Sequence, residues 1–335
     1  MAKWFWCTRM SMAVGLSVAS LLAAVPAGAA PADEDRSHRH VRDLYIVDSS
    51  DNYVSVRNRH THQQLAQVPT GNGPEHAVLA HDGRRLYTAN NRDNDVTVMD
   101  TLNNTVLATI PVGLTPLGIS VSPDDQLLYV ANATSATLSV ISTATETVVD
   151  TVPLDGAPGA TALSPDGSRL YVAGTGPSLG EVAVLDTATL AVLTRIATPG
   201  SSQFESAITP DGRTLYVADG NQTAIEVIDT TTDTLLATVG TTHTPTALAV
   251  SPNGRELMIG TGGLTQVLDT LDTATNTVTR SIPFTFVSGI AYTPDGRHAY
   301  VAEYGENQVQ EINTRTLAVL STIPQRAAHL VLLRH

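Results

Sequence analysis

From residue 44 onward, short apolar stretches alternate with polar turns, and the same pattern returns about every 42 residues. The apolar stretches are rich in Val, Ile, Thr and Tyr, which favour a pleated, half-buried strand. No segment after residue 43 keeps a 3.6-residue apolar period, so helices are not expected there. The most regular stretch reads Leu-Tyr-Val-Ala or a variant of it, at 44–48, 86–90, 128–132, 170–174, 215–219, 257–261 and 299–303.

One period predicts four short strands. In the period that begins at Gly113, the strands are expected at 118–122, 127–131, 137–142 and 147–152. The first two strands of most periods are joined by a Ser/Thr-Pro-Asp-Gly turn, in which Pro fixes φ, Asp bonds its own backbone and Gly takes a left-handed conformation. Four antiparallel strands in a repeat of this length predict one blade of a β-propeller.

The two ends of the repeat region predict how the ring closes. The region begins at 44–48, which has the pattern of a second strand, and ends at 327–333, which has the pattern of a first strand without a successor. We therefore predict an all-β fold, a seven-bladed β-propeller of four-stranded antiparallel blades over residues 44–335. The C-terminal strand would join the N-terminal blade and close the ring, which removes the exposed ends that an open stack of sheets would leave.

The N-terminus has the layout of a secretory signal peptide. A basic start with Lys3 and Arg9 precedes an uncharged apolar run at 10–25 and small residues at 26–30. We predict a signal peptide at 1–30 and a flexible polar leader at 31–43, so the protein would be secreted or held outside the cytoplasm, at the cell surface or beyond it. The alternative is an uncleaved anchor, but the run is short for a span of ~20 residues. No membrane insertion is expected after cleavage.

The repeat resembles a known family. The segments LYVAN at 128–132, SPDG at 164–167 and PVG at 111–113 closely resemble the YVTN-type β-propeller repeat of secreted and surface-layer proteins. The resemblance covers residues 44–333. It implies the fold without naming an activity, because lactonase-type, streptogramin-lyase-like, haem-binding nitrite reductase and quinoprotein dehydrogenase propellers have similar shapes.

Polar residues at one end of the ring are the candidate site. Some stand at the ends of the predicted second strands, and others depart from the repeat at the starts of blades. An acidic, amide-rich ring of this kind suits a divalent cation such as Ca²⁺, a glycan or a basic peptide. The alternative for the strand ends is structural, since Asp and Asn tolerate the turn that follows. The candidate ligand-binding residues are Asp48, His76, Asn90, Asn132, Glu205, Asp219, His243, Glu303 and Tyr304.

These observations favour an exported binding or scaffold propeller without turnover, which holds a small ligand, a glycan or a protein at the polar end of the channel. The alternative is a lactonase-like or streptogramin-lyase-like enzyme that uses His76 and Glu205 there. A haem enzyme would need an axial histidine, for which His76 or His243 is available. No cofactor is expected apart from the option of a divalent cation. The net charge of −13 argues against nucleic acid, and a monomer is expected.

Overall fold

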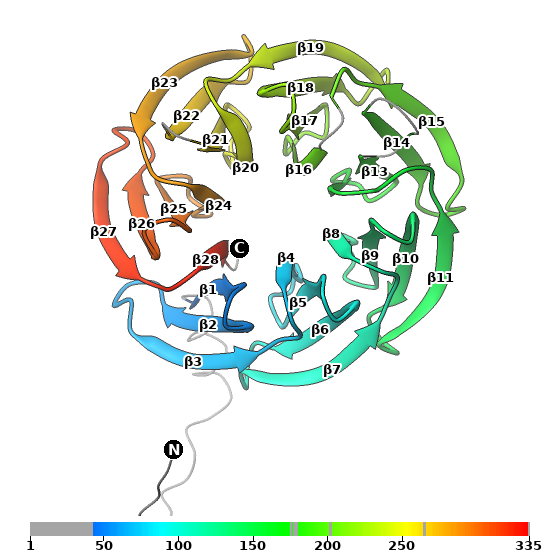
Figure 1. The fold of residues 1–335 in the computed structure, drawn as a ribbon, viewed down its shortest axis with the longest axis horizontal. Helices are drawn as coiled ribbons and strands as arrows, with labels where there is room; N and C mark the ends of the chain where they lie inside the picture. The colour runs from blue at the N-terminus through cyan, green and yellow to red at the C-terminus, as the bar shows by residue number, and fades with distance from the viewer. Residues whose placement is uncertain (1–42, 175, 177–179, 201–202, 264–265, 334–335) are drawn as a thin grey trace, which may run out of the picture.

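Seven four-stranded antiparallel sheets surround one axis in the computed structural model, which describes residues 43–333 except 175, 177–179, 201–202 and 264–265 (Figure 1). The predicted all-β, seven-bladed propeller is confirmed. The predicted signal peptide and the leader up to residue 42 lie outside the described residues, and Asp43 already begins the first strand. Within the described part of the chain, no helix is long and apolar enough to cross a membrane.

The strands of each blade follow one another outward from the axis (Figure 1). In blades 1 to 4 they are β28 (Ala328–Leu333), β1 (Asp43–Asp48), β2 (Tyr53–Asn58), β3 (Gln64–Pro69); β4 (Pro74–Leu79), β5 (Arg85–Asn90), β6 (Asp95–Asp100), β7 (Thr105–Pro111); β8 (Pro116–Val121), β9 (Leu127–Asn132), β10 (Thr137–Ser142), β11 (Thr147–Pro153); β12 (Thr161–Leu163), β13 (Arg169–Ala173), β14 (Glu181–Asp186), β15 (Val192–Ala197). In blades 5 to 7 they are β16 (Gln203–Ile208), β17 (Thr214–Asp219), β18 (Ala224–Asp229), β19 (Thr234–Gly240); β20 (Thr244–Val250), β21 (Glu256–Gly262), β22 (Val267–Asp272), β23 (Thr277–Pro283); β24 (Val287–Tyr292), β25 (His298–Glu303), β26 (Gln308–Asn313), β27 (Val319–Pro324).

The ring closes as the two chain ends predict. Strand β28 pairs antiparallel with β1, and Leu44 lies opposite Leu333 in the register. Side chains add to this seam: the Arg57 guanidinium donates to the Pro324 carbonyl at 3.2 Å, and Gln325 Nε2 donates to the Tyr53 hydroxyl at 2.9 Å. Blade 1 is therefore built from both ends of the described chain and has four strands like the other six.

The Leu-Tyr-Val-Ala stretch is buried on both faces because it is the second strand of a blade and lies between two neighbours. The described apolar core forms seven clusters, one at each interface between consecutive blades. The tyrosine of the stretch fills this interface, and in three blades its hydroxyl reaches a partner in the next blade. Tyr216 donates to Asn276 Oδ1 at 3.2 Å, and Tyr300 donates to the Arg59 carbonyl at 3.1 Å. A buried aromatic with a satisfied hydroxyl is well suited to this position.

The Ser-Pro-Asp-Gly turns cover the opposite end of the ring from the inter-blade loops. In one of them, Ser164 Oγ donates to Asp166 Oδ1 at 2.6 Å and accepts from the Arg169 amide at 3.0 Å. Gly167 has φ +71°, and a Cβ there would lie 2.8 Å from Cδ of Pro123 in the preceding blade. Glycine is thus required twice, by the backbone conformation and by the neighbouring blade.

Candidate functional site

The five candidate residues at the ends of second strands lie inside the blades. All are 0–2% exposed: Asp48, Asn90, Asn132, Asp219 and Glu303. Asn132 Nδ2, for example, donates to Thr137 Oγ1 at 3.1 Å and to Ser139 Oγ at 2.9 Å on the neighbouring strand. Glu303 accepts hydrogen bonds from the Thr285 amide and hydroxyl and from Gln308. The sequence pattern could not separate this arrangement from a channel-lining ring, since both place a polar residue at the strand end.

The glycine of the inter-blade PVG segment packs on the same strand-end side chain. A Cβ on Gly113 would lie 2.7 Å from Cγ of Asn132, and a Cβ on Gly200 would lie 1.9 Å from a carboxylate oxygen of Asp219. The strand-end residues therefore hold the loop that leads into the next blade. This packing explains why glycine and Asn or Asp recur together in the repeat.

His243 and Tyr304 do not line the central cavity, although Tyr304 contacts Phe286, which does. The His243 carbonyl accepts a hydrogen bond from Thr241 Oγ1. Burial raises the pKa of Asp269, and the electrostatic interaction with His243 lowers it again in part. Tyr304 is 42% exposed and meets Phe286 edge to face, with ring centroids 6.2 Å apart.

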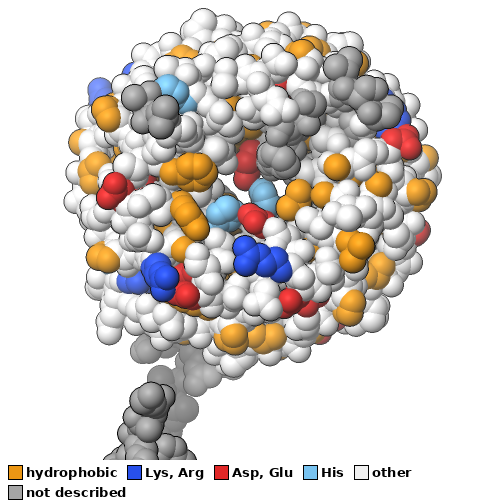
Figure 2. Space-filling view, viewed as in Figure 1, with side chains coloured by type: hydrophobic (Ala, Val, Ile, Leu, Met, Phe, Trp, Pro, Cys, Tyr) orange, Lys and Arg blue, Asp and Glu red, His pale blue; other side chains and the backbone are white. Residues whose placement is uncertain are grey.

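A cavity of about 270 Å³ lies where the innermost strands of five blades meet. We call it the channel cavity. Figure 2 shows histidine and acidic side chains gathered in the central hollow of this face. The face carries the inter-blade loops and the loops between second and third strands, where the sequence predicted a ligand. The cavity lining includes residues of β4, β16, β20, β24 and β28 and of the loop before β24. They are Glu75, His76, Glu205, Thr246, Phe286, Ser288 and His329.

His76 and Glu205, the pair singled out from the sequence, meet in this cavity. His76 Nδ1 lies 3.7 Å from Glu205 Oε1, just beyond hydrogen-bond distance, and both side chains are 21% exposed. Burial raises the pKa of Glu205 to about 8. Burial, together with the neighbouring His329, lowers the pKa of His76 to about 4. At neutral pH the pair is therefore uncharged, and its proton lies on the carboxyl group.

A second imidazole–carboxylate pair lies next to the first. His329 Nε2 is 3.1 Å from Glu75 Oε2, and Asn91 Nδ2 donates to Glu75 Oε1 at 2.9 Å. The hydrogen bond from His329 holds the pKa of Glu75 below its usual value, against the opposing effect of burial. Neither Glu75 nor His329 is among the candidate ligand-binding residues that the sequence indicates. Aligning 328–333 with the first strand 74–79 would have placed His329 beside Glu75.

Among the residues that the structure describes, no group of three or more His, Cys, Asp or Glu side chains is arranged to hold a metal ion. The two pairs supply acid, base and hydrogen-bonding groups. At neutral pH the channel cavity thus holds one carboxyl group kept protonated by burial and one carboxylate fixed by hydrogen bonds.

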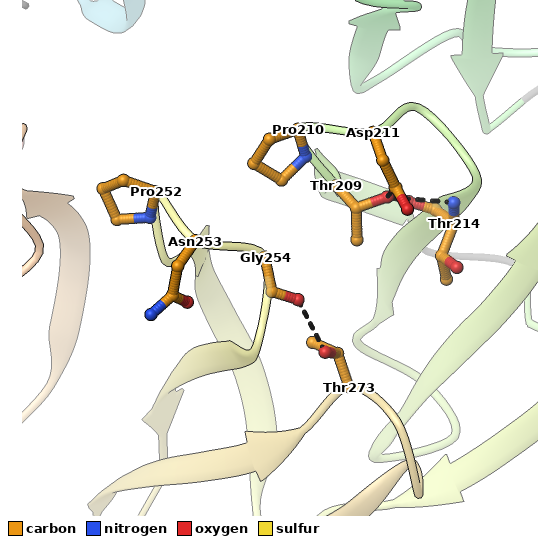
Figure 3. A pocket seen from close by; sticks show the side chains of 8 residues that line it. All are labelled: Thr209, Pro210, Asp211, Thr214, Pro252, Asn253, Gly254 and Thr273. Carbon is orange, nitrogen blue, oxygen red and sulfur yellow. Dashed lines mark hydrogen bonds between the residues drawn. The ribbon is translucent and has the colours of Figure 1, made fainter.

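A larger hollow, of about 380 Å³, lies on the opposite face between the turns of blades 5 and 6 (Figure 3). We call it the turn-face hollow; Thr209, Asp211, Asn253, Gly254 and Thr273 line it. Its polar groups are used within the turns. Thr209 Oγ1 donates to Asp211 Oδ1, and Thr273 Oγ1 donates to the Gly254 carbonyl, both at 2.6 Å. The same bonds recur in other blades, so this hollow is a product of the repeat.

Comparison with known proteins agrees with the fold. A family model described as the cytochrome D1 heme domain matches residues 39–170, and no curated protein matches the chain. A hydrazine synthase structure from Kuenenia stuttgartiensis is 24% identical with a TM-score of 0.75, over 82% of this chain and 92% of that one. The dihydro-heme d1 dehydrogenase NirN in complex with DHE is 18% identical with a TM-score of 0.64, over 86% and 74%. A candidate 6-phosphogluconolactonase from Bacteroides fragilis is 16% identical with a TM-score of 0.72, over 90% and 99%.

Proposed function

We propose that this protein is a ligand-binding propeller whose site is the channel cavity. The observation that carries the proposal is the meeting of Glu75, His76, Glu205 and His329, from three blades, in one cavity. These residues depart from the repeat, so the architecture does not need them. Perturbed carboxyl and imidazole groups in a cavity are typical of functional sites.

A thermal-shift screen tests the proposal. A ligand that binds only the folded protein raises its melting temperature by mass action. We expect at least one small polar compound to raise the melting temperature of the wild type and to lose this effect in His76→Ala. The exposed Glu306, on a loop of the same face, supplies the control variant Glu306→Gln, which should respond like the wild type. Equal responses of His76→Ala and the wild type to every compound would reject the site.

Acid–base catalysis is the second candidate, favoured by the 3.7 Å approach of His76 to Glu205. In lactone hydrolysis, His76 would take a proton from the attacking water while Glu205, protonated at neutral pH, gives one to the departing ring oxygen. Hydrolysis of glucono-δ-lactone, followed by acid release, checks this function. We expect His76→Ala and Glu205→Gln each to lose about 10²-fold in rate. A wild-type rate equal to the uncatalysed rate would reject catalysis on this lactone and leave the binding proposal in place.

A haem-type cofactor fits the described cavity poorly, although two of the matches concern heme proteins. Neutral His76 is able to ligate iron. However, a haem carries acidic substituents, and the cavity is lined by two carboxyl groups and by no Lys or Arg among the described residues. Its volume of about 270 Å³ is also below the ~300–1,000 Å³ of sites for drug-sized ligands. We therefore derive no step through a haem.

We also propose that the protein is exported to the cell surface or medium after cleavage of a signal peptide, and that it is a monomer. The YVTN-type resemblance of the repeat is part of this proposal. The sequence layout of residues 1–30 supports export. Mass spectrometry of the protein recovered from the culture medium would test it: the expected chain begins near residue 31, and recovery of the intact chain from the cytoplasm alone would contradict export.

A further inference from the structure

Two hydroxyl groups in the lining of the channel cavity, those of Thr246 and Ser288, already donate their hydrogens to the protein. Thr246 Oγ1 donates its hydrogen to the Val287 carbonyl at 2.5 Å, and Ser288 Oγ donates to the Ala328 carbonyl at 2.7 Å. A hydroxyl group has one hydrogen and two lone pairs, so each oxygen keeps only acceptor capacity. A ligand that meets these groups must bring donors of its own.

The two carboxyl groups of the cavity are not equally available. Both oxygens of Glu75 have partners, Asn91 and His329. Within the described part of the chain, Glu205 has no hydrogen bond to its carboxyl group, and His76 Nδ1 lies at 3.7 Å. Glu205 is therefore the carboxyl group left to contact a ligand, while Glu75 orients His329.

The rest of the lining favours a positive charge. No Lys or Arg side chain lines the cavity among the described residues, and Phe286 contributes an aromatic ring. A cation close to an aromatic ring gains about 0.5–2 kcal/mol, depending on how far it is desolvated. A carboxylate or phosphate ligand would instead meet the Glu75 carboxylate and two hydroxyl oxygens whose hydrogens are already donated.

We propose that the channel cavity binds a small organic cation whose ammonium group donates to Glu205 and whose apolar part packs against Phe286. This inference rests on the proposed binding function and names its ligand class. An ammonium group has three donors and no acceptor, which matches the spare acceptors of the cavity. The volume of about 270 Å³ limits the ligand to a compact amine.

Binding of such a cation changes the protonation of the site. The cation makes the ionised form of Glu205 favourable, so binding near pH 7 should release close to one proton. The other titratable groups that face Glu205 are His76 and Glu75 on β4 and His329 on β28. Because His76 is neutral at this pH, it does not repel the ligand.

Isothermal titration of n-butylammonium into the full chain tests the inference, with n-butanol and butyrate as neutral and anionic analogues of the same length. Titration at pH 7 in two buffers of different ionisation enthalpy counts the released protons. We expect saturable binding of n-butylammonium alone, with proton release. Glu205→Gln should weaken binding about tenfold or more, since a charge-assisted hydrogen bond is lost. Glu306→Gln, the same change at an exposed position of this face, should bind like the wild type.

The outcomes separate this inference from the proposed function. Binding of butyrate or n-butanol that depends on His76 would overturn the cation and leave a ligand site. Binding of Ca²⁺ by EDTA-treated protein in a Glu205-dependent way, without binding of n-butylammonium, would replace the organic cation by a metal ion. Binding of n-butylammonium that Glu205→Gln leaves unchanged would place the ligand elsewhere and overturn the inference. If none of the probes binds and the thermal-shift screen is also negative, both proposals fail.

Discussion

The turn-face hollow and the channel cavity differ in a way that their sizes do not reveal. The turn-face hollow is the larger, at about 380 Å³, yet its threonine and aspartate side chains complete the turns that carry them. The channel cavity is smaller, at about 270 Å³, but its Glu205 carboxyl group has no hydrogen bond among the described residues. Spare bonding capacity, rather than volume, identifies the site.

The origin of the difference is the repeat itself. Each turn meets its counterpart in the next blade, so one set of residues can satisfy every turn of that face. At the centre of the ring, Glu75 and His76 come from blade 2, Glu205 from blade 5 and His329 from blade 1. No repeated neighbour exists for these side chains. We therefore expect substitutions on the turn face to change stability alone, and substitutions in the channel cavity to change ligand affinity as well.

The largest effect on stability is expected for Gly167→Val on the turn face. The substitution forces a β-branched residue into φ +71° and against Pro123 of the neighbouring blade. We expect the free energy of unfolding to fall by about 2–3 kcal/mol, measured by urea unfolding. Gly240→Ala is the matched control, because a Cβ at Gly240 meets nothing within 4 Å. Equal stabilities of the two variants would contradict the requirement for glycine in this turn.

Glu205→Gln in the channel cavity is expected to raise stability at neutral pH. The folded-state pKa of Glu205, about 8, lies above its unfolded value, so the folded protein binds an extra proton and loses stability as pH rises from about 4.5 to 8. Glutamine does not titrate, so the variant does not lose stability over this pH range. We expect a gain on the order of 2 kcal/mol at pH 7, since one pKa unit corresponds to about 1.4 kcal/mol.

The pH window of that measurement separates Glu205 from His76. The folded-state pKa of His76, about 4, lies below its unfolded value, so His76 costs stability only as pH falls from about 6.5 to 4. Above pH 6.5 the difference between the wild type and Glu205→Gln should therefore widen up to about pH 8. A difference that stays constant across this range would show that burial does not perturb Glu205.

A smaller loss of stability is expected for Asn132→Ala, which removes one of the buried strand-end residues. The side chain donates to Thr137 and Ser139 and supports Gly113 of the inter-blade segment. Its removal should cost about 1–2 kcal/mol, measured by urea unfolding. Binding of n-butylammonium should be unchanged. A loss of affinity without a loss of stability would mean that the strand-end residues contact the ligand.

The fold was predictable because the same local signals recur from blade to blade along the chain. The Pro-Asp-Gly turns, the tyrosine stretch and the unpaired C-terminal strand each indicate the same ring, and β28 closes blade 1 as expected. Propensity, turn chemistry and hydrophobic pattern agree, which is the condition for reading a fold from sequence.

The site was only partly predictable because the repeat hides which end-of-strand residues reach the axis. His76 and Glu205 were found as departures from the pattern, and they do meet. Asn90 and Asp219 look equally polar in the sequence but point into the blades, where they are fully buried. His329 was overlooked because it lies in the closing strand, whose neighbours are far away in the sequence. The burial of Glu205 depends on residues from other blades, which no local pattern reports.

The smallest effect is expected where the turn face departs from its own consensus. Asn253 replaces the usual aspartate, and its Oδ1 accepts from Ser251 Oγ at 2.9 Å and from the Arg255 amide at 3.0 Å. In the matching turn, hydrogen bonds from Ser164 and Ser168 lower the pKa of Asp166 to about 2. Asn253→Asp should therefore stabilise the protein at neutral pH, by less than about 0.5 kcal/mol at this exposed position.

The pH dependence of that gain has a defined sign. Since the folded-state pKa of the new aspartate would be lowered, the gain should be present above about pH 4 and lost as pH falls further. Paired urea unfolding curves at pH 7 and pH 3 check it, with titration of n-butylammonium at pH 7. The affinity should be unchanged, although Asn253 lines the larger of the two hollows. A change in affinity would mean that the turn-face hollow takes part in binding, and the contrast between the two faces would then be wrong.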